Sequence, residues 1–190
     1  MDLSETDSAI YTVLRRRQQT RDIPHPATII LFCGIPGSGK TTLAQRLLRD
    51  LQAQYVHNDA ARELARANGV QNFKPHAVTR ALIQTILTED ANKLMVYDAT
   101  IDHRWREMIA FCQEHNLPHI TIRINISPDE ALARMEKRGR ADNDTLRELM
   151  PRQVANFEAT KKELPADIEL TASFDYEKVL QAVREKLTQL

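Results

Sequence analysis

The chain has 190 residues, which is enough for one domain of ordinary size. Hydrophobic residues make up 42% of it and charged residues 27%, a balance typical of a globular protein with a buried core. Its 26 basic and 26 acidic residues cancel, which excludes a global field that would draw the chain to nucleic acid or to an anionic membrane.

The N-terminal segment, residues 1–26, predicts a helix followed by a linker. Residues from about Glu5 to Gln19 place apolar side chains at helical spacing, and Pro24 and Pro26 end that pattern. The segment opens with acidic residues and lacks the apolar core of a secretory signal peptide, and no apolar run is long enough to span a bilayer. We therefore expect a cytoplasmic protein without a membrane segment, whose one domain occupies residues 27–190.

Strands and helices are predicted to alternate along that domain. Runs of apolar and β-branched residues, typical of strands, occur at Thr28–Phe32, Gln54–His57, Leu94–Tyr97, Ile120–Ile126 and Asp167–Thr171. Helices are expected at 41–51, 58–67, 75–89, 103–115, 127–138, 145–163 and from 176 to the C-terminus. This alternation predicts an α/β fold with a mostly parallel five-stranded sheet covered by helices on both sides. In such folds, ligands bind beyond the carboxyl ends of the strands.

A glycine-rich loop joins the first strand to the first helix of the domain. Its residues are Gly34, Ile35, Pro36, Gly37, Ser38, Gly39, Lys40 and Thr41. Glycines allow backbone N–H groups to point inward, and the helix that follows presents its positive end to an anion. In this pattern the lysine reaches the β- and γ-phosphates, and the hydroxyl after it binds Mg²⁺. The alternative, a glycine-rich turn with an incidental lysine, leaves the strand before the loop and the helix after it unexplained.

The loop therefore predicts a site for ATP and Mg²⁺, with GTP left open as the donor. The residues expected to bind the nucleotide are Gly34, Pro36, Gly37, Ser38, Gly39, Lys40, Thr41 and Thr42, together with Arg138. Asp98 closes the third strand, where nucleotide-binding proteins place a carboxylate that faces the metal, so Thr41 and Asp98 are the expected metal ligands. Asp98 and the small residue Thr100 are also expected near the substrate. Asp98 could instead cap a helix, although Asp102 is the better candidate for that cap.

Asp59 follows the second strand and is the candidate general base. A carboxylate there could accept the proton of an acceptor hydroxyl that attacks the γ-phosphorus. Arg62 lies three residues later on the same helical face and could bind an anionic group of the acceptor. The alternative is structural: Asp59 caps its helix, and Arg62 pairs with Glu63 or Glu148 at the surface.

Basic residues gather at the end of the helix predicted over residues 127–138 and in the turn beyond it. Arg134 and Arg138 are four residues apart and share a face, which favours an anion between them, because phosphoryl transfer needs donors on the transferring oxygens. Gly139 would let this region, about residues 136–146, close and open as a lid. The alternative is a solvated basic helix end that interacts favourably with the helix dipole.

Four segments in this order resemble a known family. The loop GIPGSGKTT, then HNDAAR, VYDAT and RMEKRGR, are similar to the P-loop kinase family that contains the polynucleotide 5′-hydroxyl kinase domains, with zeta-toxins and small antibiotic phosphotransferases as relatives. The similarity covers about 28–158. It implies an adenylate-kinase-like three-layer α/β/α fold with an arginine-bearing lid, and ATP-dependent phosphorylation of a hydroxyl.

The resemblance also implies roles for single residues. Asp59 matches the general base, Arg62 the arginine on an acceptor phosphate, and Asp98 the acid near the metal. Arg138 matches a lid arginine on the triphosphate, and Arg134 falls at a second lid position, so Lys40, Asp59, Arg134 and Arg138 are the expected catalytic residues. Asn58 stands where some members have a basic residue, which weakens the case for a nucleic-acid acceptor. Ile101-Asp102 replaces a pair such as Asn-Leu.

Three functions remain open from the sequence. The first is an ATP:hydroxyl phosphotransferase whose acceptor is a polynucleotide 5′ end, a nucleotide sugar or a small metabolite, with the polynucleotide placed first by resemblance alone. The second is a nucleotide-binding ATPase switch that acts on a protein partner. The third is a toxin-like kinase of a cell-wall precursor.

Overall fold

The computed structural model describes residues 7–8, 11, 27–67, 74–89, 93–139 and 143–190, including every side chain in these ranges except those of residues 59–60, 63–64 and 143. Residues 7, 8 and 11 are helical, and the remainder of the predicted N-terminal helix and linker lies outside the described residues. Among all the described residues, no helix is long and apolar enough to cross a membrane.

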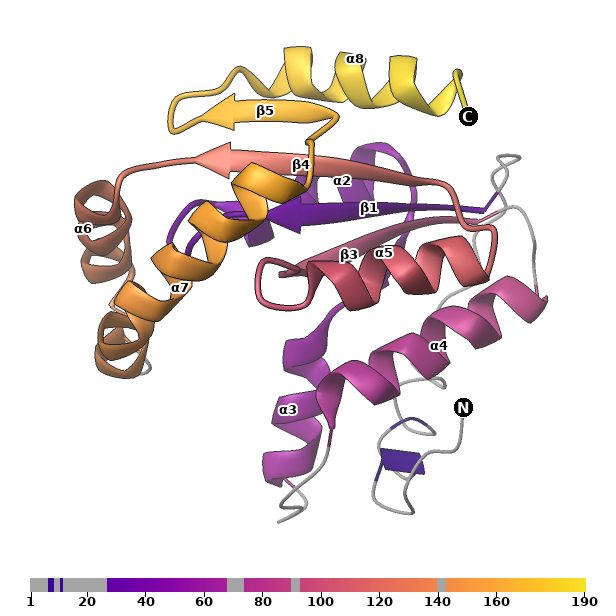
Figure 1. Cartoon of the computed structure of the whole chain (residues 1–190), viewed down its shortest axis with the longest axis horizontal. Helices are drawn as coiled ribbons and strands as arrows, with labels where there is room; N and C mark the ends of the chain where they lie inside the picture. Colours follow the sequence, from indigo (N-terminus) through magenta and orange to yellow (C-terminus); the bar gives the residue numbers. More distant parts are fainter. Residues whose placement is uncertain (1–6, 9–10, 12–26, 68–73, 90–92, 140–142) are drawn as a thin grey trace.

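Five parallel strands form the centre of the molecule (Figure 1). They are β1 (Thr28–Cys33), β2 (Gln54–Val56), β3 (Leu94–Thr100), β4 (His119–Asn125) and β5 (Ile168–Thr171), and they lie in the order β2-β3-β1-β4-β5. In the register of the sheet, Ile29 of β1 pairs with Met95 of β3 and with His119 of β4. The prediction of a five-stranded α/β fold is confirmed, and all of its strand pairs are parallel.

Helices connect the strands and cover both faces of the sheet. They are α2 (Lys40–Asp50), α3 (Asn58–Ala67), α4 (Pro75–Glu89), α5 (Trp105–Glu114), α6 (Pro128–Arg138), α7 (Asn143–Glu163) and α8 (Tyr176–Leu187). Several starts and ends follow from local chemistry. Ser127 caps α6 by accepting the N–H of Glu130, with Pro128 in the first turn, and Asp175 caps α8 by accepting the N–H of Glu177.

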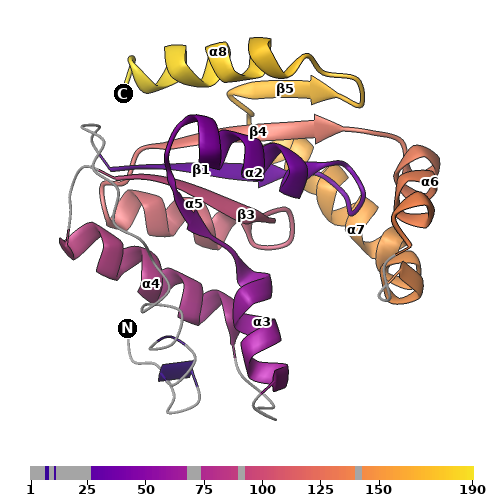
Figure 2. The ribbon, with the colours of Figure 1, turned by 180° about the vertical axis from the view of Figure 1, so that it is seen from behind.

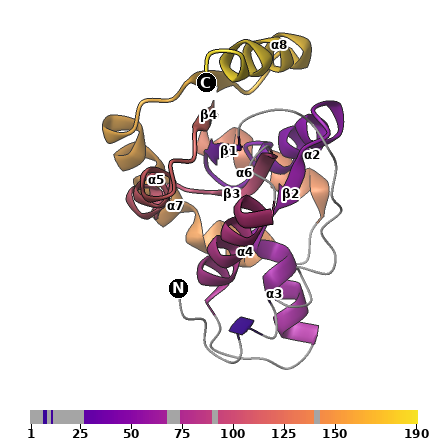
Figure 3. The ribbon, with the colours of Figure 1, turned by 90° about the vertical axis from the view of Figure 1, so that its right-hand side faces the viewer.

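The two faces of the sheet belong to two separate apolar clusters. Along β1, Ile29, Leu31 and Cys33 pack toward α3, α4, α5, α6 and α7, whereas Ile30 and Phe32 pack toward α2 and α8. Figure 2 shows α2 in front of the sheet, and Figure 1 shows α5 and α7 in front of the opposite face. Figure 3 shows α3 and α4 near the described N-terminal residues. Burial on both faces explains why the sequence of β1 is apolar throughout.

The boundaries around the third strand differ from the prediction. β3 continues past Asp98 to Thr100, and the helix expected from His103 begins only at Trp105. Between them, the N–H of Ile101 donates to the carbonyl oxygen of Phe32 in β1 at 3.1 Å. We attribute the extension of β3 to Thr100 to this hydrogen bond, because it keeps the backbone after Asp98 paired with β1.

Candidate active site

The glycine-rich loop lies at the carboxyl end of the central strand β1 and contacts α6. Gly37 and Gly39 have φ angles of +81° and +100°, in the left-handed region that glycine adopts without strain. A Cβ on Gly37 would lie 2.5 Å from the carbonyl oxygen of Ala131 in α6. The loop therefore needs glycine at position 37 both for its backbone conformation and for the close approach of α6.

Lys40, the first residue of α2, holds its ammonium group against the loop. Nζ donates to the carbonyl oxygens of Gly34 at 2.7 Å and Ile35 at 2.8 Å. Burial lowers the pKa of Lys40 to about 8, while the carboxylate of Asp102 opposes that shift by favouring the charged form. Lys40 is thus a partly buried cation whose protonation responds to the charges around it.

Thr41 and Asp98 meet at the end of β3. The Thr41 hydroxyl donates to Oδ1 of Asp98 at 3.1 Å, and the Tyr55 hydroxyl of β2 donates to Oδ2 at 2.6 Å. Hydroxyl and carboxylate oxygens are the ligands that Mg²⁺ prefers, so this pair fits the metal that the sequence predicts. Tyr55, which the sequence did not single out, holds the carboxylate of Asp98 in place.

Asp102 has a role that the sequence analysis missed. Its Oδ2 accepts the N–H of Gly34 at 2.8 Å and a short hydrogen bond from the Thr100 hydroxyl, and its carbonyl oxygen accepts the Thr160 hydroxyl of α7 at 2.7 Å. The prediction that Asp102 caps the next helix is wrong, because its carboxylate is occupied by the loop and α5 has no side-chain cap at Arg104. Only 4% of Asp102 is exposed, so it ties the first glycine of the loop to the end of β3.

Both predicted lid arginines reach the loop or the first turn of α2. Arg138 donates to the Thr42 hydroxyl at 3.2 Å. Arg134 contacts the carbonyl oxygen of Ser38 at 3.5 Å, donates to that of Ala172 at 2.9 Å and pairs with Glu130. Arg134 is therefore held at the loop by backbone carbonyls, whereas Arg138 is exposed at the end of α6.

The structure places the predicted acceptor residues on a different helix from the lid. Asp59 and Arg62 both lie on α3, which follows β2, and the Asp59 side chain lies outside the described residues. Arg62 is exposed, and its positive charge helps to lower the pKa of His76 at the start of α4. Burial together with the positive charge of Arg104 lowers the pKa of His76 to about 4, and Arg62 adds to that shift.

Comparison with known proteins agrees with this geometry. A family model described as AAA domain matches residues 29–160, more than half of the chain. The fold is similar to that of a gluconokinase from Sinorhizobium meliloti 1021, at 13% identity and a TM-score of 0.54, covering 88% of this chain and 94% of that one. It is also similar to an APS kinase from Mycobacterium tuberculosis in complex with AMPPNP and APS, at 16% identity and a TM-score of 0.55, covering 88% of this chain and 100% of the other.

A search of curated proteins found no match. The five-stranded parallel sheet, the loop between β1 and α2, and these two structures agree on one architecture, the adenylate-kinase-like P-loop fold of the small kinases. The matched residues run from β1 to α7 and include the glycine-rich loop, Asp98 and both arginines of α6. The chain belongs to the AAA domain family.

Proposed function

We propose that the protein is an ATP-dependent kinase that transfers the γ-phosphate to a hydroxyl group of a small acceptor. The observation that carries this proposal is the convergence on one loop of a partly buried lysine, a threonine–aspartate pair and an arginine. These residues are Lys40, Thr41 with Asp98, and Arg138. Phosphoryl transfer is catalysed mainly by positioning and by charge stabilisation, and this set supplies donors and metal ligands for both.

Each residue has a distinct task in the proposed reaction. The loop N–H groups and Lys40 hold the triphosphate, and Thr41 and Asp98 hold Mg²⁺, which neutralises charge on the phosphate oxygens when bound. Asp59 takes the proton of the acceptor hydroxyl while that oxygen bonds to the γ-phosphorus and the bond from phosphorus to the leaving ADP breaks. Arg138, with Arg134 behind it, stabilises the charge that spreads over the transferring group.

A small acceptor is favoured over a polynucleotide end. Two proteins with this fold are named gluconokinase and APS kinase, and both names refer to small molecules. The balanced charge of the chain gives no field that would attract nucleic acid, and Asn58 precedes Asp59 where a basic residue would serve a polynucleotide. The resemblance to polynucleotide kinases supports the nucleotide side of the site and carries less weight for the acceptor.

The decisive experiment follows label from γ-labelled ATP. The purified protein is incubated with Mg²⁺ and separate acceptors: hydroxy acids, sugars, nucleosides, nucleotide sugars and 5′-hydroxyl oligonucleotides. We expect label on a small acceptor, with at least a hundredfold loss in Lys40→Ala and in Asp59→Asn. Lys161→Ala and Glu158→Gln, both at exposed positions of α7 outside the predicted lid, are the matched controls and should keep full activity.

Two other results would contradict a small-molecule kinase. Label on oligonucleotides alone would restore the polynucleotide acceptor. Slow release of phosphate that Asp59→Asn leaves unchanged, without label on any acceptor, would contradict the kinase and indicate an ATPase switch with a protein partner.

A further inference from the structure

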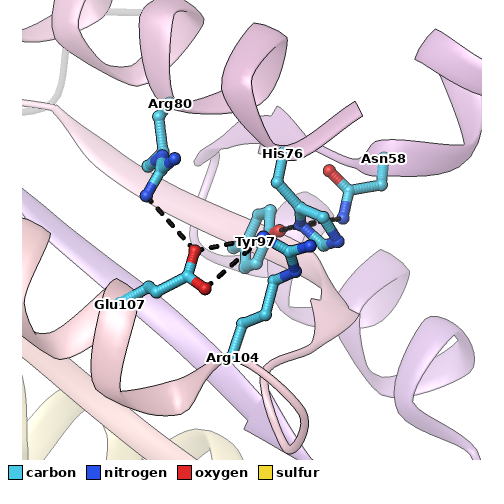
Figure 4. Close-up of polar contacts among 6 residues, drawn as sticks. All are labelled: Asn58, His76, Arg80, Tyr97, Arg104 and Glu107. Atoms are coloured by element: carbon cyan, nitrogen blue, oxygen red, sulfur yellow. Dashed lines mark hydrogen bonds and ion pairs between the residues drawn. The ribbon is translucent and has the colours of Figure 1, made fainter. Parts of the chain in front are cut away.

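Two arginines share one glutamate where α4 faces the start of α5 (Figure 4). Oε2 of Glu107 lies 3.6 Å from Nη1 of Arg80 and 3.1 Å from Nη1 of Arg104. The three side chains, called here the arginine–glutamate cluster, are 25%, 45% and 50% exposed for Arg80, Arg104 and Glu107. One carboxylate neutralises only one of the two guanidinium groups, so the cluster carries an excess positive charge.

The cluster also has hydrogen-bond donors to spare. Each guanidinium has five N–H donors, and a single carboxylate cannot accept from all of them. Nε of Arg80 is buried and has no hydrogen-bond partner among the described residues. That atom is closed to a water-sized molecule, so an oxyanion would bind the remaining donors of the two partly exposed guanidinium groups.

Beside the cluster lies a set of neutral polar groups. Nδ2 of Asn58 donates to the Tyr97 hydroxyl at 2.9 Å and contacts Nδ1 of His76 at 3.1 Å, while Oδ1 of Asn58 accepts the Thr79 hydroxyl at 2.6 Å. Because the amide nitrogen can only donate, Nδ1 of the neutral His76 ring is the acceptor and Nε2 carries the proton. With its pKa near 4, His76 stays uncharged at neutral pH and offers a hydrogen bond without a charge.

Two pockets meet at these residues. The larger has a volume of about 470 Å³ and is lined by Lys74, Pro75, His76, Ala77, Arg80 and Arg104. The smaller has a volume of about 10 Å³, which is room for about one water molecule; it shares three of these residues and reaches the end of β3 at Thr100 and Ile101. Pockets of about 300–1,000 Å³ are typical for small organic ligands, so the space suits a compact molecule.

Hydrogen bonds connect the lining of the smaller pocket to the glycine-rich loop. Thr100, in its lining, donates to Asp102, which accepts the N–H of Gly34 at the start of the loop. Asn58, beside His76, directly precedes the proposed base Asp59 in the chain. A ligand in the larger pocket would therefore lie beside His76, which contacts the residue before the proposed base, and hydrogen bonds through Thr100 and Asp102 connect this region to the glycine-rich loop.

We infer that the larger pocket is the acceptor site and that the acceptor is a small hydroxylated oxyanion, its carboxylate or phosphate bound by Arg80 and Arg104 and a hydroxyl group by His76. This assignment rests on the proposed kinase function and specifies its substrate class. The arginines fix the anionic end, because guanidinium groups bind carboxylates and phosphates through paired hydrogen bonds. That anchor leaves a hydroxyl at the other end of the molecule for transfer.

Binding can be tested without turnover by ligand-observed NMR on the full chain with Mg²⁺ and AMPPNP. The probes are gluconate, glucose 6-phosphate and the neutral polyol glucitol at millimolar concentration, which separates carboxylate, phosphate and uncharged ligands. We expect saturation transfer to at least one of the two anions and none to glucitol. In Arg80→Gln and in Arg104→Gln the signal should fall at least tenfold, whereas Arg184→Gln, an exposed arginine of α8, should retain it.

Glu107→Gln keeps the assignment falsifiable if the arginine variants fold poorly. This change removes the carboxylate that competes for both guanidinium groups, so anion binding should become several-fold tighter, which a damaged protein would not show. The assignment is overturned if neither anion binds, if glucitol binds equally well, if the anion signal survives loss of both arginines, or if Glu107→Gln weakens it.

A labelling experiment separates failure of this site from failure of the kinase. A protein that phosphorylates neutral acceptors as well as anionic ones, with the same KM in Arg80→Gln, would be a kinase with a different acceptor site. A protein that binds the anions at these arginines but transfers no label would keep the site and contradict the kinase.

Discussion

Among single residues, Lys40 combines a partly buried position with a pKa of about 8, well below its usual 10.5. In the absence of a ligand, the Lys40 side chain is therefore only partly protonated near pH 8. Burial disfavours the ammonium form, and the carboxylates of Asp102 and Asp98 restore only part of the loss. A triphosphate beside Nζ would add strong negative charge and raise that pKa again.

ATP binding should therefore take up a proton near pH 8 and weaken at higher pH. Below pH 8 most of the free protein already holds the proton on Lys40, whereas between pH 8 and pH 10 binding has to recruit it, so the affinity falls by up to tenfold per unit. Titration calorimetry in buffers of different ionisation enthalpy measures the uptake. Lys40→Arg, which stays charged in this range, is the control and should bind without proton uptake. An affinity that is constant from pH 7 to 9.5 would contradict the expectation.

How much of the site the sequence could predict depends on how local each contact is. The loop from Gly34 to Thr41 is contiguous, so its pattern was enough to place Lys40 and Thr41 at one helix start. Asp98 was predicted from the end of an apolar strand. Asp102 was not, because its partner Gly34 is 68 residues away and nothing near Asp102 in the sequence indicates that contact. Asp59 and the lid remain predictions.

At the scale of elements, the glycine-rich loop contacts α6 through a glycine, Gly37. Gly37 approaches the backbone of Ala131, and α6 carries Arg134 and Arg138 one to two turns later. The distance between the loop and both arginines is thus set by backbone contact. A side chain at position 37 should therefore displace α6 together with both arginines.

Gly37→Ala should both destabilise the protein and weaken ATP binding. The new Cβ would sit 2.5 Å from a backbone oxygen at a φ of +81°, so α6 has to shift. We expect a loss of unfolding free energy of about 2–4 kcal/mol in urea and at least a tenfold higher Kd for ATP. Gly139→Ala is the matched control: its φ is +59° but nothing lies within 4 Å, so only about 1 kcal/mol should be lost. Equal effects at both glycines would show that the contact with Ala131 is unimportant.

The elements themselves were largely predictable, because their signals lie within short windows. α4 begins at Pro75 and ends at Glu89 as the sequence indicates, and Ser127-Pro128 starts α6. The errors fall where a neighbouring strand decides the outcome, as in the extension of β3 to Thr100. The arginine–glutamate cluster escaped notice because Arg80 of α4 is distant in the sequence from Arg104 and Glu107 at the start of α5.

For the whole molecule, α8 completes the face of the sheet that α2 begins. The Tyr176 hydroxyl donates to Asp50 of α2 at 2.6 Å, and the Arg46 guanidinium lies 3.5 Å from the centre of the Tyr176 ring. Leu180 and Val183 are buried on the sheet. The C-terminal helix is thus part of the core, although none of the predicted site residues lies on it.

Leu180→Ala should lower stability without changing the site. Removal of a buried leucine side chain costs about 2–5 kcal/mol of unfolding free energy, whereas Leu190→Ala, at a residue 52% exposed, should cost less than about 0.5 kcal/mol. Urea unfolding of the two variants measures the difference. The Kd for ATP of the folded Leu180→Ala protein should stay within twofold of the wild type, and a larger change would mean that α8 influences the loop.

The division of β1 between two clusters has a consequence for how this chain tolerates change. The arginine–glutamate cluster lies on the side of Ile29 and Leu31, and α8 packs on the side of Ile30 and Phe32. Substitutions on opposite faces of the sheet fall in separate apolar clusters. Their changes in unfolding free energy should therefore be additive in double-mutant cycles. The sheet separates two independently packed halves, so residues on the side of the proposed acceptor site can be substituted while the packing between α2, α8 and the sheet stays unchanged.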